Sequence, residues 1–171
     1  MKKIAKTVLL LLFLASGLTL HAQDITDGQT INLDGLEVTF RVVNQESVEI
    51  KGAKFDRYKV VASVKNNTQK SYNVRLKNYP DPSSFTAGKL VELNCVNATG
   101  AKLTSKKIEV KMNTQQVSVT YPTKDKNDKI INSLMVIIAG YYLDPGQTVE
   151  NDTIFIVPKD EKPKVTVRPL S

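Results

Sequence analysis

The chain has 171 residues, with 24 Lys and Arg against 17 Asp and Glu, and its net charge is +7. It contains one Cys (Cys95), one His (His21) and no Trp. One Cys cannot form an intrachain disulfide, and it is too few for a zinc site built from Cys and His.

Residues 1–22 have the residue order of a secretory signal peptide. Three lysines come first, an apolar run from Val8 to Leu14 follows, and small residues lead to Ala22. We expect cleavage after Ala22 and export to the periplasm, the cell surface or the medium. An uncleaved membrane anchor is the alternative, but the apolar run is shorter than the ~20 residues of a spanning helix. No later segment predicts a membrane span in the mature chain.

Cleavage would change which chemistries the chain can perform. Removing 22 of the 171 residues leaves one domain of 149 residues, 23–171, and His21 leaves with the signal. Without His, Ser–His–Asp and Cys–His catalysis are excluded. The charge falls to a mild excess of 21 basic over 17 acidic residues, which does not indicate a nucleic-acid partner. No nucleotide-binding motif is present, so we expect no cofactor and no metal.

The mature chain is dominated by period-two alternation of apolar and polar residues, which predicts β-strands. In "LEVTFRVV", for example, Leu36, Val38 and Phe40 alternate with charged and polar residues. Clusters of Gly, Pro, Asn and Asp separate most of the runs and predict turns. Several short strands at this spacing indicate a β-sandwich or a barrel. The other predicted strands are "YKVVASVK", "SYNVRLK", "VELNCV", "KKIEVKM", "VSVTY", "TIFIVP" and "KVTVRP".

The segment Lys129–Leu143, "KIINSLMVIIAGYYL", is apolar almost throughout. Its β-branched and aromatic residues favour a strand in the second half, and a strand buried on both faces would have this composition. Gly140 predicts a bulge within it. A short helix over Lys129–Met135 is the alternative.

The stretch that follows, "LDPGQ", predicts a tight turn at Asp144–Gln147. Pro145 has the φ required at the second position of a type II turn, and Gly146 accepts the positive φ required at the third. The chain then returns as a strand that ends at Pro158, and Val165 and Val167 form a last strand after a charged loop.

Three stretches resemble telokin-like, immunoglobulin-like extracytoplasmic domains of bacteria. "ASVKNNTQKSYNV" is similar to their early strand pair, with the pattern V-x-N-x-[ST]. "LVELNCVNATGAKL" resembles their middle hairpin, and "YYLDPGQTVENDTIFIVPKDEKPKVTV" resembles their ending. The resemblance covers roughly Arg57–Pro169, and the basic insert "NTQQVSVTYPTKDKNDK" is longer than the pattern requires. The resemblance implies a single immunoglobulin-like β-sandwich, and the family has no catalytic residues to transfer to this chain.

Several residues are candidates for binding or modification. Lys107, Lys111, Lys124 and Lys126 could form a basic patch for an anionic polysaccharide or lipid surface, but a solvated face is the favoured interpretation. No aromatic residues are interleaved with them, which argues against nucleic acid. Thr153, in "DTI", resembles a bacterial O-glycosylation site.

Other polar groups have structural interpretations. "DKNDK", Asp125–Lys129, lacks the Gly and distal Glu of a calcium loop and predicts a polar turn. Asp24–Gly28 predicts a flexible N-terminal segment. Asn66, Asn97 and Asn151 begin N-x-[ST] sequons, which we interpret as turns. The alternation in "VELNCV" places Cys95 on the apolar side of its strand, which predicts a core position for it.

These observations predict a non-catalytic interaction or structural module of the bacterial cell envelope. Its partner would be an envelope protein or glycan, bound through end loops or a sheet edge, with "SYNVRL" and "KVTVR" as candidate edges. The alternative is a carboxylate-based hydrolase acting on envelope polysaccharide, which would need two carboxylates ~5–10 Å apart in a cleft.

Overall fold

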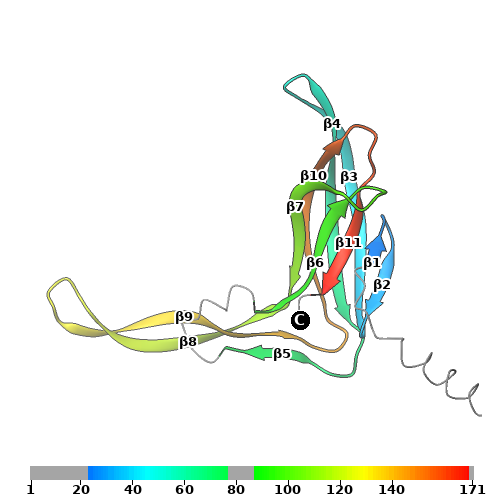
Figure 1. Cartoon of the computed structure of the whole chain (residues 1–171). Helices are drawn as coiled ribbons and strands as arrows, with labels where there is room; N and C mark the ends of the chain where they lie inside the picture. Colours follow the sequence, from blue (N-terminus) through cyan, green and yellow to red (C-terminus); the bar gives the residue numbers. More distant parts are fainter. Residues whose placement is uncertain (1–22, 77–86, 170–171) are drawn as a thin grey trace, which may run out of the picture.

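The structure is a computed structural model that describes residues 23–76 and 87–169. This part of the chain is all β, with antiparallel strands in three sheets and no helix (Figure 1). It therefore contains no helix that could cross a membrane.

Two four-stranded sheets form a sandwich-like body, as the alternation predicts. The first has the order β1-β11-β6-β7, and the second β10-β4-β3-β2. The strands of the first sheet are β1 (Gln23–Ile25), β6 (Lys89–Val96), β7 (Lys102–Lys111) and β11 (Lys164–Pro169). Those of the second are β2 (Thr30–Leu33), β3 (Leu36–Ile50), β4 (Ala53–Asn66) and β10 (Thr148–Pro158).

One hydrophobic core lies between these two sheets, because alternate side chains of each strand point inward. In β4 the inward set is Tyr58, Val60, Ala62 and Val64, all of which are buried. From the opposite sheet, β6 and β7 contribute the buried residues Leu93, Cys95, Ile108 and Val110. The core position predicted for Cys95 is confirmed, and burial raises the pKa of its thiol to about 12.

The prediction of a flexible N-terminal segment at Asp24–Gly28 is wrong for its first residues. Asp24 and Ile25 belong to β1, which pairs with β11. Ile25 is buried in the core, and the Asp24 carboxylate accepts a hydrogen bond from Thr166 Oγ1 and contacts Lys164 Nζ at 2.6 Å. Pairing with β11, one buried apolar side chain and two polar contacts hold this short strand.

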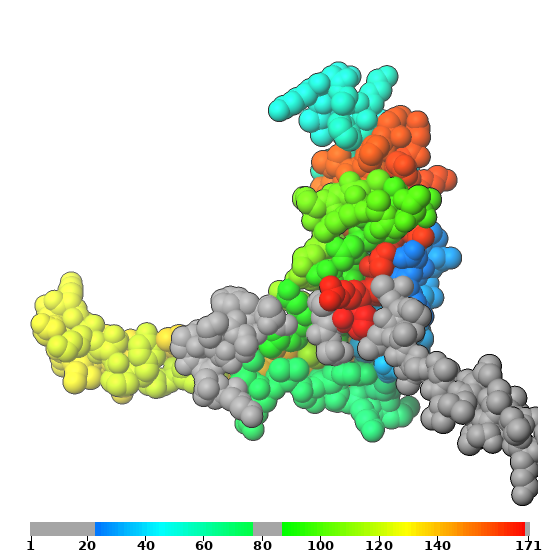
Figure 2. Space-filling model, in the orientation of Figure 1, coloured from blue at the N-terminus to red at the C-terminus, as the bar shows by residue number. Residues whose placement is uncertain are grey.

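The third sheet has the order β5-β9-β8 and projects away from the body (Figure 1). It consists of β5 (Tyr72–Arg75), β8 (Asn113–Lys124) and β9 (Ile130–Leu143). The outer parts of β8 and β9 form a long hairpin that extends beyond the two packed sheets, visible as an isolated projection in Figure 2. We call residues 113–143 the arm.

The structure of the arm differs from the prediction for Lys129–Leu143 in two respects. All of Ile130–Leu143 is a strand, so the helix alternative is wrong. Burial on both faces is also wrong for the outer half, where Ile130 and Leu134 are exposed. Only the inner end of the strand, with Tyr141 and Leu143, packs into the core. The pairing partner β8 decides the conformation, because it supplies backbone hydrogen bonds along the whole length of β9.

The turn predicted at Asp144–Gln147 is confirmed, and it connects the arm to the body. Gly146 has a φ of 77°, and the Gln147 N–H donates to Asp144 O at 3.0 Å. β10 then starts at Thr148 and ends at Pro158, as the proline predicts.

Candidate interaction surface

The two strands of the arm carry no charge outside the tip. Residues 113–123 and 130–143 contain no Asp, Glu, Lys or Arg. All charges of the arm lie in Lys124–Lys129, which contains three lysines and two aspartates. Exposed strands are normally protected from association by charged side chains. The arm lacks this protection along most of its length.

The pairing register assigns the side chains of the arm to two faces. Direct cross-strand partners share a face, and β8 pairs with β9 from Gln116 opposite Ile138 to Lys124 opposite Ile130. We call them the Val119 face and the Leu134 face. The Val119 face carries Val117, Val119, Tyr121, Thr123, Ile131, Ser133, Met135 and Ile137. The Leu134 face carries Gln116, Ser118, Thr120, Pro122, Lys124, Ile130, Asn132, Leu134, Val136 and Ile138.

Both faces of the arm expose large apolar side chains. On the Leu134 face, Leu134 is 71% exposed, Ile130 68% and Val136 58%. On the Val119 face, the exposed fractions of Val117, Tyr121 and Ile131 are lower, at 38–41%. Isolated exposed apolar residues are ordinary on protein surfaces, but a contiguous group marks an interaction site. Here the group occupies one projecting hairpin.

A bulge changes the pairing of the arm near its base. Gln115 pairs with Gly140, and Gln116 pairs with Ile138, so Ala139 is the extra residue in β9. This confirms a bulge next to Gly140. A Cβ at Gly140 would lie 2.5 Å from Val74 O of β5, so a side chain there would push β5 away. Gly140 thus allows β5 to pair closely with the inner end of β9.

The side chain of Asn66 fastens the base of the arm to the body. Asn66 is buried at the end of β4, and its Nδ2 donates to Leu143 O at 3.0 Å and to Lys70 O at 2.8 Å. Its Oδ1 accepts hydrogen bonds from the N–H and the hydroxyl of Thr68. This is the V-x-N-x-[ST] pattern of the sequence, and its Asn and Thr hold the loop between β4 and β5 and the last residue of β9.

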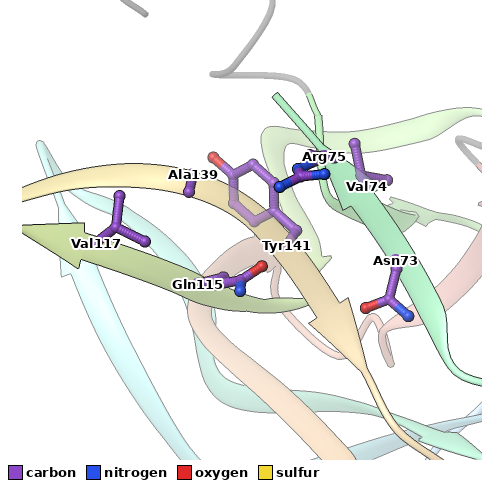
Figure 3. A pocket seen from close by; sticks show the side chains of 7 residues that line it. All are labelled: Asn73, Val74, Arg75, Gln115, Val117, Ala139 and Tyr141. Atoms are coloured by element: carbon purple, nitrogen blue, oxygen red, sulfur yellow. The ribbon is translucent and has the colours of Figure 1, made fainter. Parts of the chain in front are cut away.

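A shallow groove lies at the base of the arm, across the three strands of the third sheet. It has a volume of about 270 Å³ and is lined by Asn73, Val74, Arg75, Gln115, Val117, Ala139 and Tyr141. In Figure 3, Tyr141 of β9 lies between the β5 residues on one side and Gln115 and Val117 on the other. The groove is smaller than most pockets for small molecules, and its lining contains no carboxylate. It continues the Val119 face toward the body.

The tip of the arm is the polar turn that the sequence predicts. The Asp125 carboxylate oxygen Oδ1 accepts hydrogen bonds from the N–H groups of Asn127 and Lys129, at 2.8 and 3.0 Å. Lys124 Nζ contacts Asp128 at 3.1 Å. One carboxylate oxygen each of Asp125 and Asp128 is thus used within the turn, and the described residues contain no cluster of three metal-ligating side chains.

The structure separates the four lysines of the candidate basic patch. Lys124 and Lys126 lie at the tip of the arm, whereas Lys107 and Lys111 lie in β7 of the body (Figure 1). Lys107 Nζ is also paired, at 2.5 Å from Glu92 and 2.8 Å from Glu109. These lysines do not form one surface.

The carboxylates most relevant to the hydrolase alternative are Glu92 and Glu109, which are cross-strand partners in β6 and β7. The hydrogen bond from Lys107 lowers the pKa of Glu92, and hydrogen bonds from Lys107 and Lys89 lower the pKa of Glu109 to about 2. Asp56 is buried, and hydrogen bonds from the Asp160 N–H, Ser47 and Lys159 lower its pKa. A general acid needs a raised pKa, which none of the three has.

The low pKa of Glu109 makes the free energy of unfolding fall at acidic pH. Its contribution is complete above pH 4.5, the ordinary pKa, and is lost as the pH falls toward about 2. We expect Glu109→Gln to lower the urea midpoint of unfolding at pH 7 and to make little difference near pH 2. Urea titrations of both proteins from pH 7 to pH 2 measure this. Glu150→Gln, at an exposed position of β10, is the control, and an unchanged pH dependence in Glu109→Gln would contradict the assignment.

The remaining candidate residues lie in the body. Thr153 is half-buried in β10 opposite Val60, on the core side of the strand. The Asn97 side chain holds the turn between β6 and β7, accepting hydrogen bonds from Thr99 and Ala101. The turn interpretation is confirmed for Asn97, whereas Asn66 is the last residue of β4 and Asn151 lies within β10.

Of the two candidate edge strands, one is an edge. β5, within "SYNVRL", is the outer strand of the third sheet. β11, within "KVTVR", lies between β1 and β6, so its prediction as an edge is wrong. The edge at β8 was not among the edges predicted from the sequence. Its signal was the insert "NTQQVSVTYPTKDKNDK", which alternates without a charge until its end.

No protein-family model, curated protein or solved structure matches this chain.

Proposed function

We propose that this chain is an exported, non-catalytic interaction module of the bacterial cell envelope. The sandwich, which we assign to the immunoglobulin-like, telokin-like class, is the scaffold, and the arm is the binding element. The observation that carries the proposal is the exposure of Ile130, Leu134 and Val136 on a projecting hairpin whose strands carry no charge outside the tip.

Covering these side chains would yield appreciable binding energy. Complete burial of a Leu, Ile or Val side chain is worth about 1.5–3 kcal/mol. Ile130, Leu134 and Val136 are 58–71% exposed, so most of this surface remains to be buried by a partner. A partner that covers all three would therefore gain several kcal/mol before the cost of association is subtracted.

The arm also offers backbone groups to a partner. Within the described residues β8 pairs only with β9, so its outer edge presents N–H and C=O groups to an added strand. A strand edge that is free within the described residues, on a surface without charge outside its tip, favours a protein partner over an anionic glycan. Lipid alone is a poor partner for such an edge, because hydrocarbon cannot satisfy the backbone groups.

The residue order of 1–22 supports export as the route to this partner. The periplasm, the cell surface and the medium all place the arm where envelope proteins are accessible. No observation favours the hydrolase alternative, because the candidate carboxylates are held as ion pairs by lysines.

Substitution of the exposed face tests the proposal. We expect Leu134→Lys combined with Val136→Lys to reduce the envelope protein cross-linked to an affinity-tagged copy in intact cells at least tenfold. The measurement is quantitative mass spectrometry of the cross-linked fraction. The matched control is Val43→Lys, at an exposed bulge residue of β3 in the body. Equal recovery with the arm variant and the control would contradict the proposal.

A further inference from the structure

Within residues 23–76 and 87–169, the central segment of β8 has no pairing partner on its outer edge. The bulge opposite Gln115 and Gln116 interrupts the strand pair near the base, and Pro122, which lacks an N–H, lies near the tip. Between them, Gln116–Tyr121 reads QVSVTY and contains no charge, no Pro and no Gly. Short uncharged segments of high β-propensity at a free edge are the usual templates for strand pairing.

This segment is complementary to itself. If two copies pair antiparallel with Val119 opposite Val119, then Val117 lies opposite Tyr121 of the second copy, and apolar side chains meet on one face. On the other face, Ser118 lies opposite Thr120. Such a pair has two-fold symmetry, which is the commonest symmetry of protein dimers.

The charges of the arm are compatible with this arrangement. Lys124 would lie opposite Thr114 of the second copy, so no charged residue of either strand opposes another. The two Lys124 residues would be ten positions apart along the paired strands, a separation of about 33 Å. That separation exceeds the Debye length of about 8 Å at physiological ionic strength, so the tips do not repel each other appreciably.

We propose that the arm binds a second copy of this chain, through antiparallel pairing of β8 with β8 centred on Val119. The pairing joins two third sheets into one continuous sheet and makes the Val119 face continuous across both copies. The proposal rests on the proposed function, because it assigns a second copy of the chain as one partner of the same arm. The interface is small, so we expect a reversible dimer with a dissociation constant on the order of micromolar.

Single cysteines on β8 test the register. Wild-type Cys95 is buried and leaves the background low. Under mild oxidation we expect Val119→Cys to give at least tenfold more disulfide-linked dimer than Ile156→Cys, at an exposed position of β10. Val117→Cys and Tyr121→Cys should cross-link to each other when the two proteins are mixed, and much less when each is alone. Equal cross-linking of Val119→Cys and Ile156→Cys would overturn the proposal.

Sedimentation velocity gives an independent measurement without cysteines. We expect the wild-type protein to shift from monomer to dimer with concentration, and Val119→Lys to weaken the dimer at least tenfold by placing like charges at the two-fold axis. Circular dichroism checks that the variant is folded. Monomers at every concentration would overturn the self-pairing.

The cross-linking test of the proposed function separates the two proposals in that case. If the Leu134→Lys, Val136→Lys protein loses its envelope partner although the wild type is monomeric, the proposed function stands and only the self-pairing fails. If that protein keeps the partner, both proposals fail.

Discussion

Replacing Phe155 with alanine is expected to lower the free energy of unfolding by about 3–5 kcal/mol. Phe155 is fully buried at the centre of β10 and lies opposite Tyr58 of β4, which is also buried. Removal of its ring would leave a cavity between the two sheets of the body, and the surrounding strands are tied by backbone pairs that limit their collapse. Urea unfolding followed by circular dichroism measures the loss.

The next residue provides a matched control. Ile156 occupies the same strand but points outward and is 37% exposed. Ile156→Ala removes an apolar side chain of comparable type and is expected to cost less than about 1.5 kcal/mol, since little cavity forms. Equal losses in Phe155→Ala and Ile156→Ala would contradict the placement of the core between the sheets.

Asn66→Ala is expected to cost about 2–4 kcal/mol, because four hydrogen bonds of a buried amide are lost at once. Two of them satisfy the carbonyls of Leu143 and Lys70, and the other two come from Thr68. The carbonyl of Leu143 would remain buried without this donor. Loosening at this point would also free the base of the arm, so hydrogen exchange at β5 and the inner end of β9 should rise more than exchange in β6.

Asn67→Ala is the control for this prediction. Asn67 is the adjacent residue, but it is exposed, and its Nδ2 donates to the Glu37 carboxylate at 2.7 Å on the surface. We expect its removal to change the free energy of unfolding by less than about 1 kcal/mol. If Asn66→Ala were as mild as Asn67→Ala, the side chain of Asn66 would not be the connection between body and arm.

These predictions separate two roles within the chain. Phe155 and Asn66 are inside the molecule, and their substitution should affect folding before it affects any partner. Leu134, Val136 and Val119 lie on the arm, where the side chains are exposed or half-buried and where the two strands satisfy each other's backbone. Their substitution should therefore affect association while the body stays folded.

The local features of this protein could be predicted from the sequence. Alternation identified which residues of β3, β4, β6, β7 and β11 face the core, because the side-chain period of a strand is two wherever one face is buried. The turn at Asp144–Gln147 and the end of β10 at Pro158 depend on backbone restrictions of single residues, which also act locally. The bulge beside Gly140 was also predicted locally, from a glycine inside a strand pattern.

Only the tertiary structure decided where the apolar strand Ile130–Leu143 lies. A run of apolar residues indicates burial only if another element covers it, and composition does not say whether that element belongs to the same chain. Long-range pairing also decided that β11 is internal, that Asp24 and Ile25 are held in β1, and that Lys124 lies far from Lys107. Strand order depends on contacts between residues that are distant in sequence, and alternation within one strand carries no information about its neighbours.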